Sequence, residues 1–382
     1  MGRSVAVRRI VYVSGTRADF GLMRRTLQAI HQDARLELGL CVTGMHLLPE
    51  YGQTVSEIEA TGLTILARIP VTLDGSSGAT MARALAAELD GMVEVFDRCA
   101  PDIVLVLGDR GEMLAAAIAA LHLNIPVVHI HGGELSGTVD EPVRHAISKL
   151  SHYHFTSTEG ARERLIRMGE HSTSVFVTGA PGLDGLNDGV CADRDRLCRS
   201  YGFDANAPIA LLVFHPVVQD ARDAGRQARV VVDALRDRQL QVLCLMPNSD
   251  AGGALVRAEL EALSGGDRFV LLTHLPRDEY LVCLASVDVL VGNSSSGIIE
   301  AASFELPVVN VGDRQCGRER SGNVIDVPVS YEAISKAIDR ALTVGRTPCV
   351  NVYGDGQAAQ RIVEHLATLP LDPTLLHKRN AY

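Results

Sequence analysis

Ile103-Val104-Leu105-Val106-Leu107-Gly108-Asp109-Arg110-Gly111-Glu112 is the stretch that decides the fold. Its first five residues are apolar and mostly branched, which is typical of a parallel strand covered on both faces. Glycine and charged residues follow at once. Ligands bind beyond the carboxyl ends of the strands in such sheets, so Asp109 and Arg110 stand where a site is expected. A surface ion pair without a role is the alternative for these two residues.

Similar apolar runs lie on both sides of this strand, with helical stretches between them. The first series is completed by Ile10–Val13, Leu36–Val42, Leu63–Ile69 and Val127–Ile130, with a long helix expected over Met81–Arg98. The pattern then restarts with Ile209–Phe214, Val242–Met246, Phe269–Leu272, Val287–Val291 and Val308–Val311. Two series of similar length predict an α/β protein with two doubly wound, Rossmann-like domains and a ligand in the cleft between them.

The domain boundary is expected between Thr178 and Ala207, where turn-forming and charged residues gather. We place an N-terminal domain at residues 1–180, a C-terminal domain at 181–365 and a tail at 366–382.

Composition excludes several classes of protein. The chain has 382 residues, and its net charge of -10 argues against nucleic acid or an anionic membrane as the partner. No apolar run approaches the roughly 18 residues that a membrane span needs. Eight cysteines stand singly, without a C-x-x-C pair, so we expect neither disulfides nor a zinc site and place the protein in the reducing cytoplasm.

The turn after the first strand, Ser14-Gly15-Thr16-Arg17-Ala18-Asp19-Phe20-Gly21, is a candidate anion site. Gly15 permits a tight turn, and the following helix directs the positive end of its dipole at the loop. Arg17 could hold a phosphate in a forked pair of hydrogen bonds. An ordinary strand-to-helix turn with Asp19 as the helix N-cap is the alternative.

The segment from His129 to His145 is the richest in ionisable groups. Its carboxylates and histidines could supply acid–base chemistry, because neighbouring charges can move their pKa values towards neutrality. A metal site is a competing interpretation, since strand alternation would put His129 and His131 on one face with Glu134 as a third ligand. Two structural alternatives remain, a core role for His129 and a capped helix start with solvated charges.

Three strand ends of the second half complete the set of candidates. His215-Pro216 follows one strand, and Pro216 blocks its continuation, so the imidazole is expected to leave the sheet end. Gly292-Asn293-Ser294-Ser295-Ser296-Gly297 opens a helix with three hydroxyls in a row, where a cap needs only one. Glu300 could accept hydrogen bonds from a ribose, and Arg314 adds a cation. Pro247–Gly253 also follows a strand and is turn-forming, so it is either part of the site or only a loop.

Taken in order, these motifs resemble the hydrolysing UDP-N-acetylglucosamine 2-epimerases of sialic acid biosynthesis. The resemblance runs from about Ile10 to Leu366 and includes Gly15–Asp19, Gly108–Arg110, Gly132–Glu134, Ser136-Gly137-Thr138 with Asp140, Arg144–Ile147, His215–Val217, Gly292–Gly297 and Asp313–Gln315. It implies a glycosyltransferase-B fold whose C-terminal helix, here Gln357–Leu366, returns to the first domain.

The resemblance also implies the reaction. UDP-N-acetylglucosamine and water would give N-acetylmannosamine and UDP, by anti elimination of UDP and hydration of the glycal, without a metal or another cofactor. We expect a homodimer or homotetramer. Asp109, Asp140 and His215 are assigned to proton transfer, and the nucleotide sugar is expected to contact Arg17, Asp19, Arg110, Arg144, Ser294, Ser295, Ser296, Glu300 and Arg314.

One departure from the family stands at His131, where many relatives have a catalytic glutamate. Either Glu134 or His131 takes over that role, or the substrate differs. The GDP- or UDP-linked 2,4-diacetamido-2,4,6-trideoxyglucose of legionaminic acid biosynthesis is the alternative substrate. A glycosyltransferase of the same fold, a metal-dependent hydrolase using His129, His131 and Glu134, and a non-catalytic sugar-nucleotide sensor are the alternatives from other classes.

Overall fold

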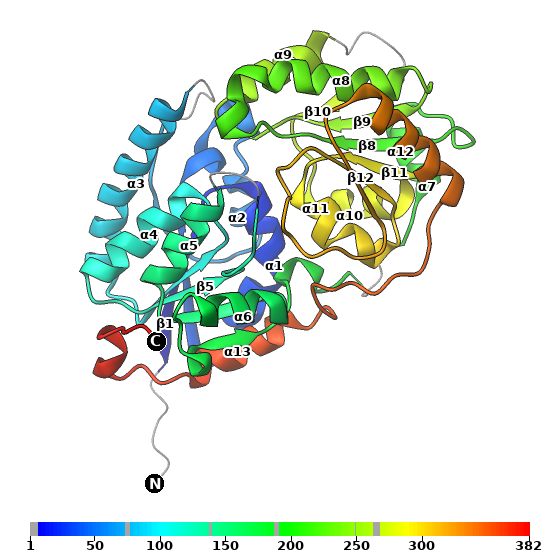
Figure 1. The fold of residues 1–382 in the computed structure, drawn as a ribbon. Helices are drawn as coiled ribbons and strands as arrows, with labels where there is room; N and C mark the ends of the chain where they lie inside the picture. The colour runs from blue at the N-terminus through cyan, green and yellow to red at the C-terminus, as the bar shows by residue number, and fades with distance from the viewer. Residues whose placement is uncertain (1–6, 73–76, 137–139, 187–190, 249, 263–267) are drawn as a thin grey trace.

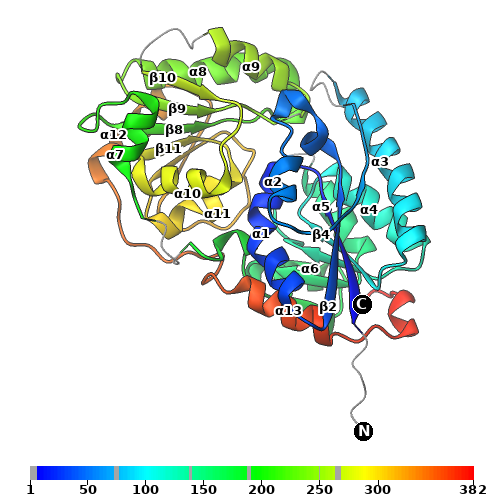
Figure 2. The same ribbon diagram turned by 180° about the vertical axis from the view of Figure 1, so that it is seen from behind.

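A computed structural model of the chain describes residues 7–72, 77–136, 140–186, 191–248, 250–262 and 268–382. Figures 1 and 2 show two α/β halves side by side, each built around its own sheet. Near the end of the chain, helix α13 (Ala358–Thr368) returns to the half that contains the N-terminal strand. The predicted two-sheet α/β class is therefore confirmed.

The described residues of the first half form a seven-stranded sheet in which every paired strand is parallel. Its strands are β1 (Arg8–Ser14), β2 (Leu36–Val42), β3 (Ile65–Arg68), β4 (Ile103–Leu107), β5 (Val127–Ile130), β6 (Tyr153–Thr156) and β7 (Val175–Val177). They lie in the order β3-β2-β1-β4-β5-β6-β7. This order reverses beside β1, and the switch point of such a sheet is where ligands bind.

The second half repeats the design with six parallel strands. They are β8 (Ile209–Val213), β9 (Gln241–Leu245), β10 (Phe269–Leu272), β11 (Val289–Gly292), β12 (Val308–Val311) and β13 (Val324–Val327). Their order is β10-β9-β8-β11-β12-β13, which puts the second switch point beside β8 and β11.

Helices cover both faces of each sheet. The α-helices other than α13 are α1 (Arg17–Gln32), α2 (Val55–Glu59), α3 (Gly78–Cys99), α4 (Gly111–His122), α5 (Asp140–Leu150), α6 (Glu159–Arg167), α7 (Arg194–Tyr201), α8 (Ala224–Arg236), α9 (Gly253–Ala262), α10 (Arg277–Ser286), α11 (Ser295–Ile299) and α12 (Tyr331–Val344). Short 3₁₀ turns lie at Gly44–Leu47, Pro49–Tyr51, Ser172–Ser174, Pro181–Leu183, Val218–Asp223, Ala301–Phe304 and Pro373–Leu376.

The wholly apolar strands are explained by this double cover. In β4, Ile103, Leu105 and Leu107 pack with α1 and α13, while Val104 and Val106 pack with α3 and α4. Successive side chains of a strand point to opposite faces, so a strand that is buried on both sides has no position for a polar residue.

The C-terminal helix returns to the first half as expected. Ile362 and Leu366 of α13 are fully buried in the same core as Leu27 of α1. The helix therefore crosses the predicted limit at residue 365, and the division of the chain at residue 180 stays a prediction. In the described part of the chain, no helix has the length and apolar character that a membrane span requires.

Candidate active site

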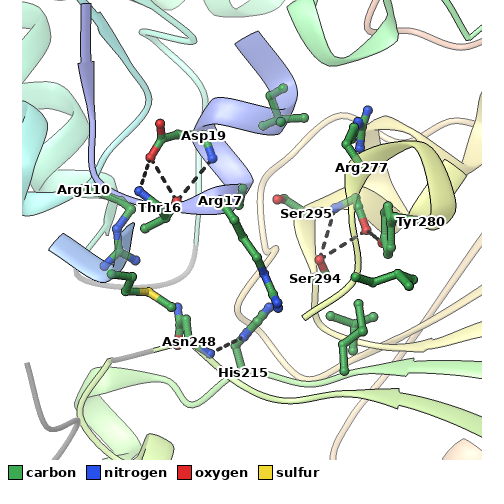
Figure 3. Close-up of a pocket in the computed structure, with 18 of the residues that line it drawn as sticks. Thr16, Arg17, Asp19, Arg110, His215, Asn248, Arg277, Tyr280, Ser294 and Ser295 are labelled. Atoms are coloured by element: carbon green, nitrogen blue, oxygen red, sulfur yellow. Dashed lines mark hydrogen bonds between the residues drawn. The ribbon is translucent and has the colours of Figure 1, made fainter. Parts of the chain in front are cut away.

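A pocket of about 280 Å³ lies between the two halves and is lined by residues that follow the carboxyl ends of β1, β4, β8, β9 and β11. Figure 3 shows Arg17 and Arg110 entering it from the first half, opposite His215 and Ser294 from the second. The structure brings eleven predicted residues to its walls, namely Arg17, Asp19, Asp109, Arg110, Asp140, His215, Ser294, Ser295, Ser296, Glu300 and Arg314. His131, Glu134 and Arg144 lie outside this lining.

The turn after β1 is held by Asp19. Its carboxylate accepts hydrogen bonds from the backbone of Gly15 at 3.0 Å and of Thr16 at 2.6 Å, so it shapes the loop. The N-cap of α1 is Thr16, and Asp19 is the third residue of the helix in a capping box, which corrects the expectation that Asp19 is the cap. Arg17 reaches across the pocket, where its Nη1 donates to the carbonyl oxygen of Thr273 at 2.6 Å.

Asp109 is presented at the end of β4. Gly108 has a φ of 82°, which turns the chain out of the strand, and its carbonyl oxygen lies 2.7 Å from His129 Nε2. The Asp109 carboxylate forms an ion pair with Arg144, whose side chain is only 1% exposed, whereas that of Asp109 is 21% exposed. Arg144 thus contacts the Asp109 carboxylate from the buried side, while Asp109 still lines the pocket.

The loop after β5 differs from the prediction. His131 follows the last strand residue, Ile130, and has a φ of 64°, so strand alternation does not place it on the face of His129. Both ring nitrogens of His129 have partners, Ser148 Oγ at 3.0 Å and the Gly108 carbonyl oxygen, and burial lowers its pKa to about 3. His129 is therefore a core histidine. Within the described ranges, no group of three His, Cys, Asp or Glu residues could hold a metal ion, so the metal-hydrolase alternative has no ligand set there.

Glu134 is buried beside the pocket, with 4% of its side chain exposed. It forms an ion pair with Arg318 from the second half, accepts a hydrogen bond from Ser157, and lies 3.1 Å from His131 Nδ1. Burial alone would raise the pKa of Glu134, but these partners, Arg318 first, lower it to about 2. His131 and Glu134 do not line the pocket, and their catalytic role stays a prediction.

Asp140 begins α5 and lines the pocket beside Asp109. Its Oδ2 lies 3.9 Å from Arg314 Nη2 across the cleft. The predicted Gly137, Thr138 and Val139 of this loop lie outside the described residues, as does Ser249 of the loop after β9.

His215 follows β8 and is fixed by two asparagines. Its backbone exchanges hydrogen bonds with the Asn293 side chain at 2.7 and 2.8 Å, and the Asn248 backbone N–H donates to His215 Nδ1 at 3.2 Å. Burial, and then the charge of Arg314, lowers the pKa of His215 to about 3. The imidazole is therefore neutral, and because Nδ1 accepts a hydrogen bond, its proton is on Nε2.

The serine-rich turn after β11 starts α11, with Ser294 as the N-cap. The Ser296 hydroxyl hydrogen-bonds to Tyr280, and Glu300 forms an ion pair with Arg277. Sequence reasoning missed Tyr280 and Arg277. They lie in the first turns of α10, and the predicted apolar run before them, Phe269–Leu272, ends several residues earlier, so the strand-end rule did not reach them. The sequence feature that could have indicated them is Leu275-Pro276-Arg277 at the start of this helix.

The sequence model for UDP-N-acetylglucosamine 2-epimerase matches residues 28–367. A UDP-N,N'-diacetylbacillosamine 2-epimerase (hydrolysing) of Legionella pneumophila is 53% identical over 98% of this chain and 100% of its own length. A UDP-N-acetylglucosamine 2-epimerase of Neisseria meningitidis is 33% identical over 92% of each chain.

Solved structures agree on the fold. The crystal structure of UDP-GlcNAc 2-epimerase from Neisseria meningitidis bound to UDP-GlcNAc superposes with a TM-score of 0.79 and 20% identity, over 94% of this chain and 99% of that one. This likeness supports the predicted glycosyltransferase-B type of fold. The extent of the family match and the 53% identity show that the chain belongs to the UDP-N-acetylglucosamine 2-epimerase family.

Proposed function

We propose that the protein is a hydrolysing 2-epimerase acting on UDP-N,N'-diacetylbacillosamine, which is UDP-linked 2,4-diacetamido-2,4,6-trideoxyglucose. The observation that carries the reaction type is one pocket in which Asp109 and Asp140 of the first half face His215, Arg314 and the serine turn of the second. The sugar is inferred from the 53% identity to the Legionella enzyme, against 33% to the Neisseria one. Family membership favours an epimerase over a glycosyltransferase or a sensor.

The first step is elimination. Asp109 takes the proton from C2 of the sugar, a C1–C2 double bond forms, and the bond from C1 to the diphosphate oxygen breaks with its electron pair leaving on UDP. A carboxylate base is required because His215 donates from Nε2 and has its lone pair on Nδ1 engaged. The Arg144 ion pair restricts the rotation of the Asp109 carboxylate.

The leaving diphosphate gains negative charge in this step, and both halves supply donors for it. Arg17 and Arg314 line the pocket, the hydroxyls and amides of Ser294–Ser296 open α11, and His215 adds its Nε2–H. Preorganised donors of this kind stabilise the charge that develops in the transition state.

The second step adds water to the glycal. The water oxygen bonds to C1 and gives up one proton to a pocket carboxylate, while C2 receives a proton on the face opposite to the one that lost it, which inverts C2. We assign the proton that C2 receives to Asp140, a second carboxylate that lines the pocket and comes from a different element, the start of α5, so that it can serve the face of the sugar that Asp109 does not. The free 2-epimer and UDP then leave.

UDP-N-acetylglucosamine, with N-acetylmannosamine as the product, is the second candidate substrate, supported by the Neisseria relative. The test is incubation of the purified protein in deuterated water with the UDP- and GDP-linked diacetamido sugars and with UDP-N-acetylglucosamine, followed by NMR. We expect free sugar carrying deuterium at C2, with the highest kcat/KM for UDP-N,N'-diacetylbacillosamine. Release of UDP only in the presence of an acceptor, or a product without deuterium, would contradict the proposal. The homodimer or homotetramer stays a prediction, which light scattering measures.

A further inference from the structure

Arg318 connects the second half of the molecule to the first at a point outside the pocket. It follows β12, and its side chain is 8% exposed. Its Nη1 donates to Glu134, 184 residues earlier in the sequence. A largely buried ion pair therefore joins the two halves next to the loop that precedes α5.

Glu134 links Arg318 to the pocket through Arg144. Its Oε2 also lies 3.8 Å from Arg144 Nη1, and Arg144 Nη2 contacts the Asp109 carboxylate. Four side chains of alternating charge thus run from Arg318 through Glu134 and Arg144 to Asp109. Only the last of them lines the pocket.

Burying these four charged side chains costs free energy, and no substrate reaches Arg318, Glu134 or Arg144. The cavity beside Glu134 and Arg318 holds about 10 Å³, roughly one water molecule, so a sugar does not fit there. Among the residues that the structure describes, Arg318 Nε and both Nε and Nη1 of Arg144 have no hydrogen-bond partner. Well-packed apolar residues would fill this place at a lower cost in free energy, which argues that the charges serve the site.

We propose that Arg318 is a positioning residue that, through Glu134, keeps Arg144 on the Asp109 carboxylate. The physical reason is competition for one guanidinium. Without Arg318, Glu134 keeps Ser157 and lies 3.1 Å from His131 Nδ1, but its nearest remaining guanidinium is that of Arg144. A buried carboxylate that loses its cation is strongly destabilising, so Glu134 attracts Arg144. Arg144 then moves towards Glu134, and Asp109 loses the partner that aims it at C2. This inference rests on the proposed epimerase reaction.

The test compares Arg318→Ala with Arg24→Ala. Arg24 also forms an ion pair between the two halves, with Asp278 at 3.0 Å, but it lies outside the pocket and outside the charged chain. Because a misplaced catalytic group commonly costs about 100-fold in rate, we expect kcat for UDP release to fall by about that factor in Arg318→Ala. The dissociation constant for UDP, from calorimetry, should stay within about twofold, since Arg318 makes no pocket contact.

Two further readouts separate positioning from a general structural role. A C2-deuterated substrate should give a larger isotope effect on kcat in Arg318→Ala than in the wild type, because proton removal becomes rate-limiting. Added guanidinium ion should restore part of the activity. If the alanine variant does not fold, the double variant Glu134→Gln with Arg318→Met removes both buried charges and with them the competition for Arg144. Its kcat should stay near the wild-type value, and a loss as large as that expected for Arg318→Ala would contradict the inference.

Several results would overturn the inference. One is a kcat of Arg318→Ala within about threefold of the wild type, and another is an equal loss of kcat in Arg24→Ala. A third is a fall in UDP affinity of Arg318→Ala that matches its fall in kcat/KM. The fourth is a lower melting temperature of Arg318→Ala together with a loss of activity that guanidinium ion does not relieve. Failure of the wild type to release UDP from any nucleotide sugar would overturn the proposed function itself. Turnover by the wild type and the alanine variant alike overturns only the role of Arg318.

Discussion

Arg144 is the residue at which stability and activity should separate most clearly on substitution. Its side chain is 1% exposed, its Nη2 contacts Asp109, and its Nη1 lies 3.8 Å from Glu134. Burial holds the pKa of Arg144 well below its ordinary value. Methionine has a similar length and no charge, so Arg144→Met replaces a buried cation with apolar volume.

The expected change in stability is small because two contributions offset each other. Two guanidinium nitrogens of Arg144 lack hydrogen-bond partners in the described structure, and such groups cost about 1–3 kcal/mol each when buried. The variant removes this cost but also removes an ion pair. Glu134 keeps Arg318, and the Asp109 side chain is 21% exposed, so neither carboxylate is left both buried and unpaired. We expect the free energy of unfolding to change by no more than about 1 kcal/mol, against the 3–5 kcal/mol that follows when a buried charge loses its only partner.

The effect on turnover should be large. Asp109 loses the group that orients it, and misplacement of a catalytic group costs about 100-fold in kcat, or about 2.7 kcal/mol in the transition state. Urea unfolding gives the stability and UDP release gives kcat, with Arg24→Met as the matched control. A variant destabilised by about 3 kcal/mol or more would refute the reasoning about buried charge, and a wild-type kcat would refute the role assigned to Arg144.

Three other changes test separate parts of the site. Asp109→Asn should lower kcat by about 10²–10⁴-fold, the usual contribution of a general base, while UDP binding measured by calorimetry changes little; retained turnover would exclude Asp109 as the base. Arg314→Ala should weaken UDP binding by about 10- to 100-fold, the equivalent of one hydrogen bond to a charged group, and an unchanged dissociation constant would place the diphosphate elsewhere. The free energy of unfolding should fall as the pH drops below 6.5. Burial lowers the pKa values of His46, His129 and His215 to about 4, 3 and 3, so the unfolded chain binds more protons than the folded chain in this range. Each histidine should cost about 1.4 kcal/mol between pH 7.5 and 5.5, and a urea midpoint that does not change over this interval would contradict the neutral buried imidazoles.

The fold was predictable from the sequence wherever burial on both faces made a strand wholly apolar. The predicted runs Leu36–Val42, Ile103–Leu107 and Val127–Ile130 coincide with β2, β4 and β5. The strands β6, β7 and β13 were not predicted. In β6 a buried polar residue breaks the apolar pattern, since His154 pairs with Glu170 at 3.0 Å, a contact that local sequence does not reveal.

The site was predictable to the extent that strand ends carry it. Asp109, Arg110 and His215 follow β4 and β8, and the structure brings all three to one pocket. The rule fails at His131, because the positive φ after β5 turns the loop away from the strand direction. It also gives no sign of the pair between Glu134 and Arg318, which depends on how the two halves are docked.

The partners of the pocket arginines indicate where a diphosphate gains most. Arg110 already faces the carboxylates of Glu112 and Asp250, each at 3.3 Å, and Arg277 is paired with Glu300. The other two donate hydrogen bonds to carbonyl oxygens, Arg17 to Thr273 at 2.6 Å and Arg314 to Asn293 at 3.1 Å. Arg314 also lies 3.9 Å from Asp140 Oδ2, which is beyond hydrogen-bond distance.

Hydrogen bonds between ionised partners are about twice as strong as those between neutral ones, so exchanging a carbonyl oxygen for a phosphate oxygen is a net gain. Exchanging a carboxylate for a phosphate changes the free energy little, because both partners are ionised, and it leaves the carboxylate without a partner. We therefore expect the diphosphate to bind between Arg17 and Arg314, one from each half. Arg110 and Arg277 are expected to keep their carboxylates and fix the walls around it, which would make nucleotide binding depend on both halves being docked.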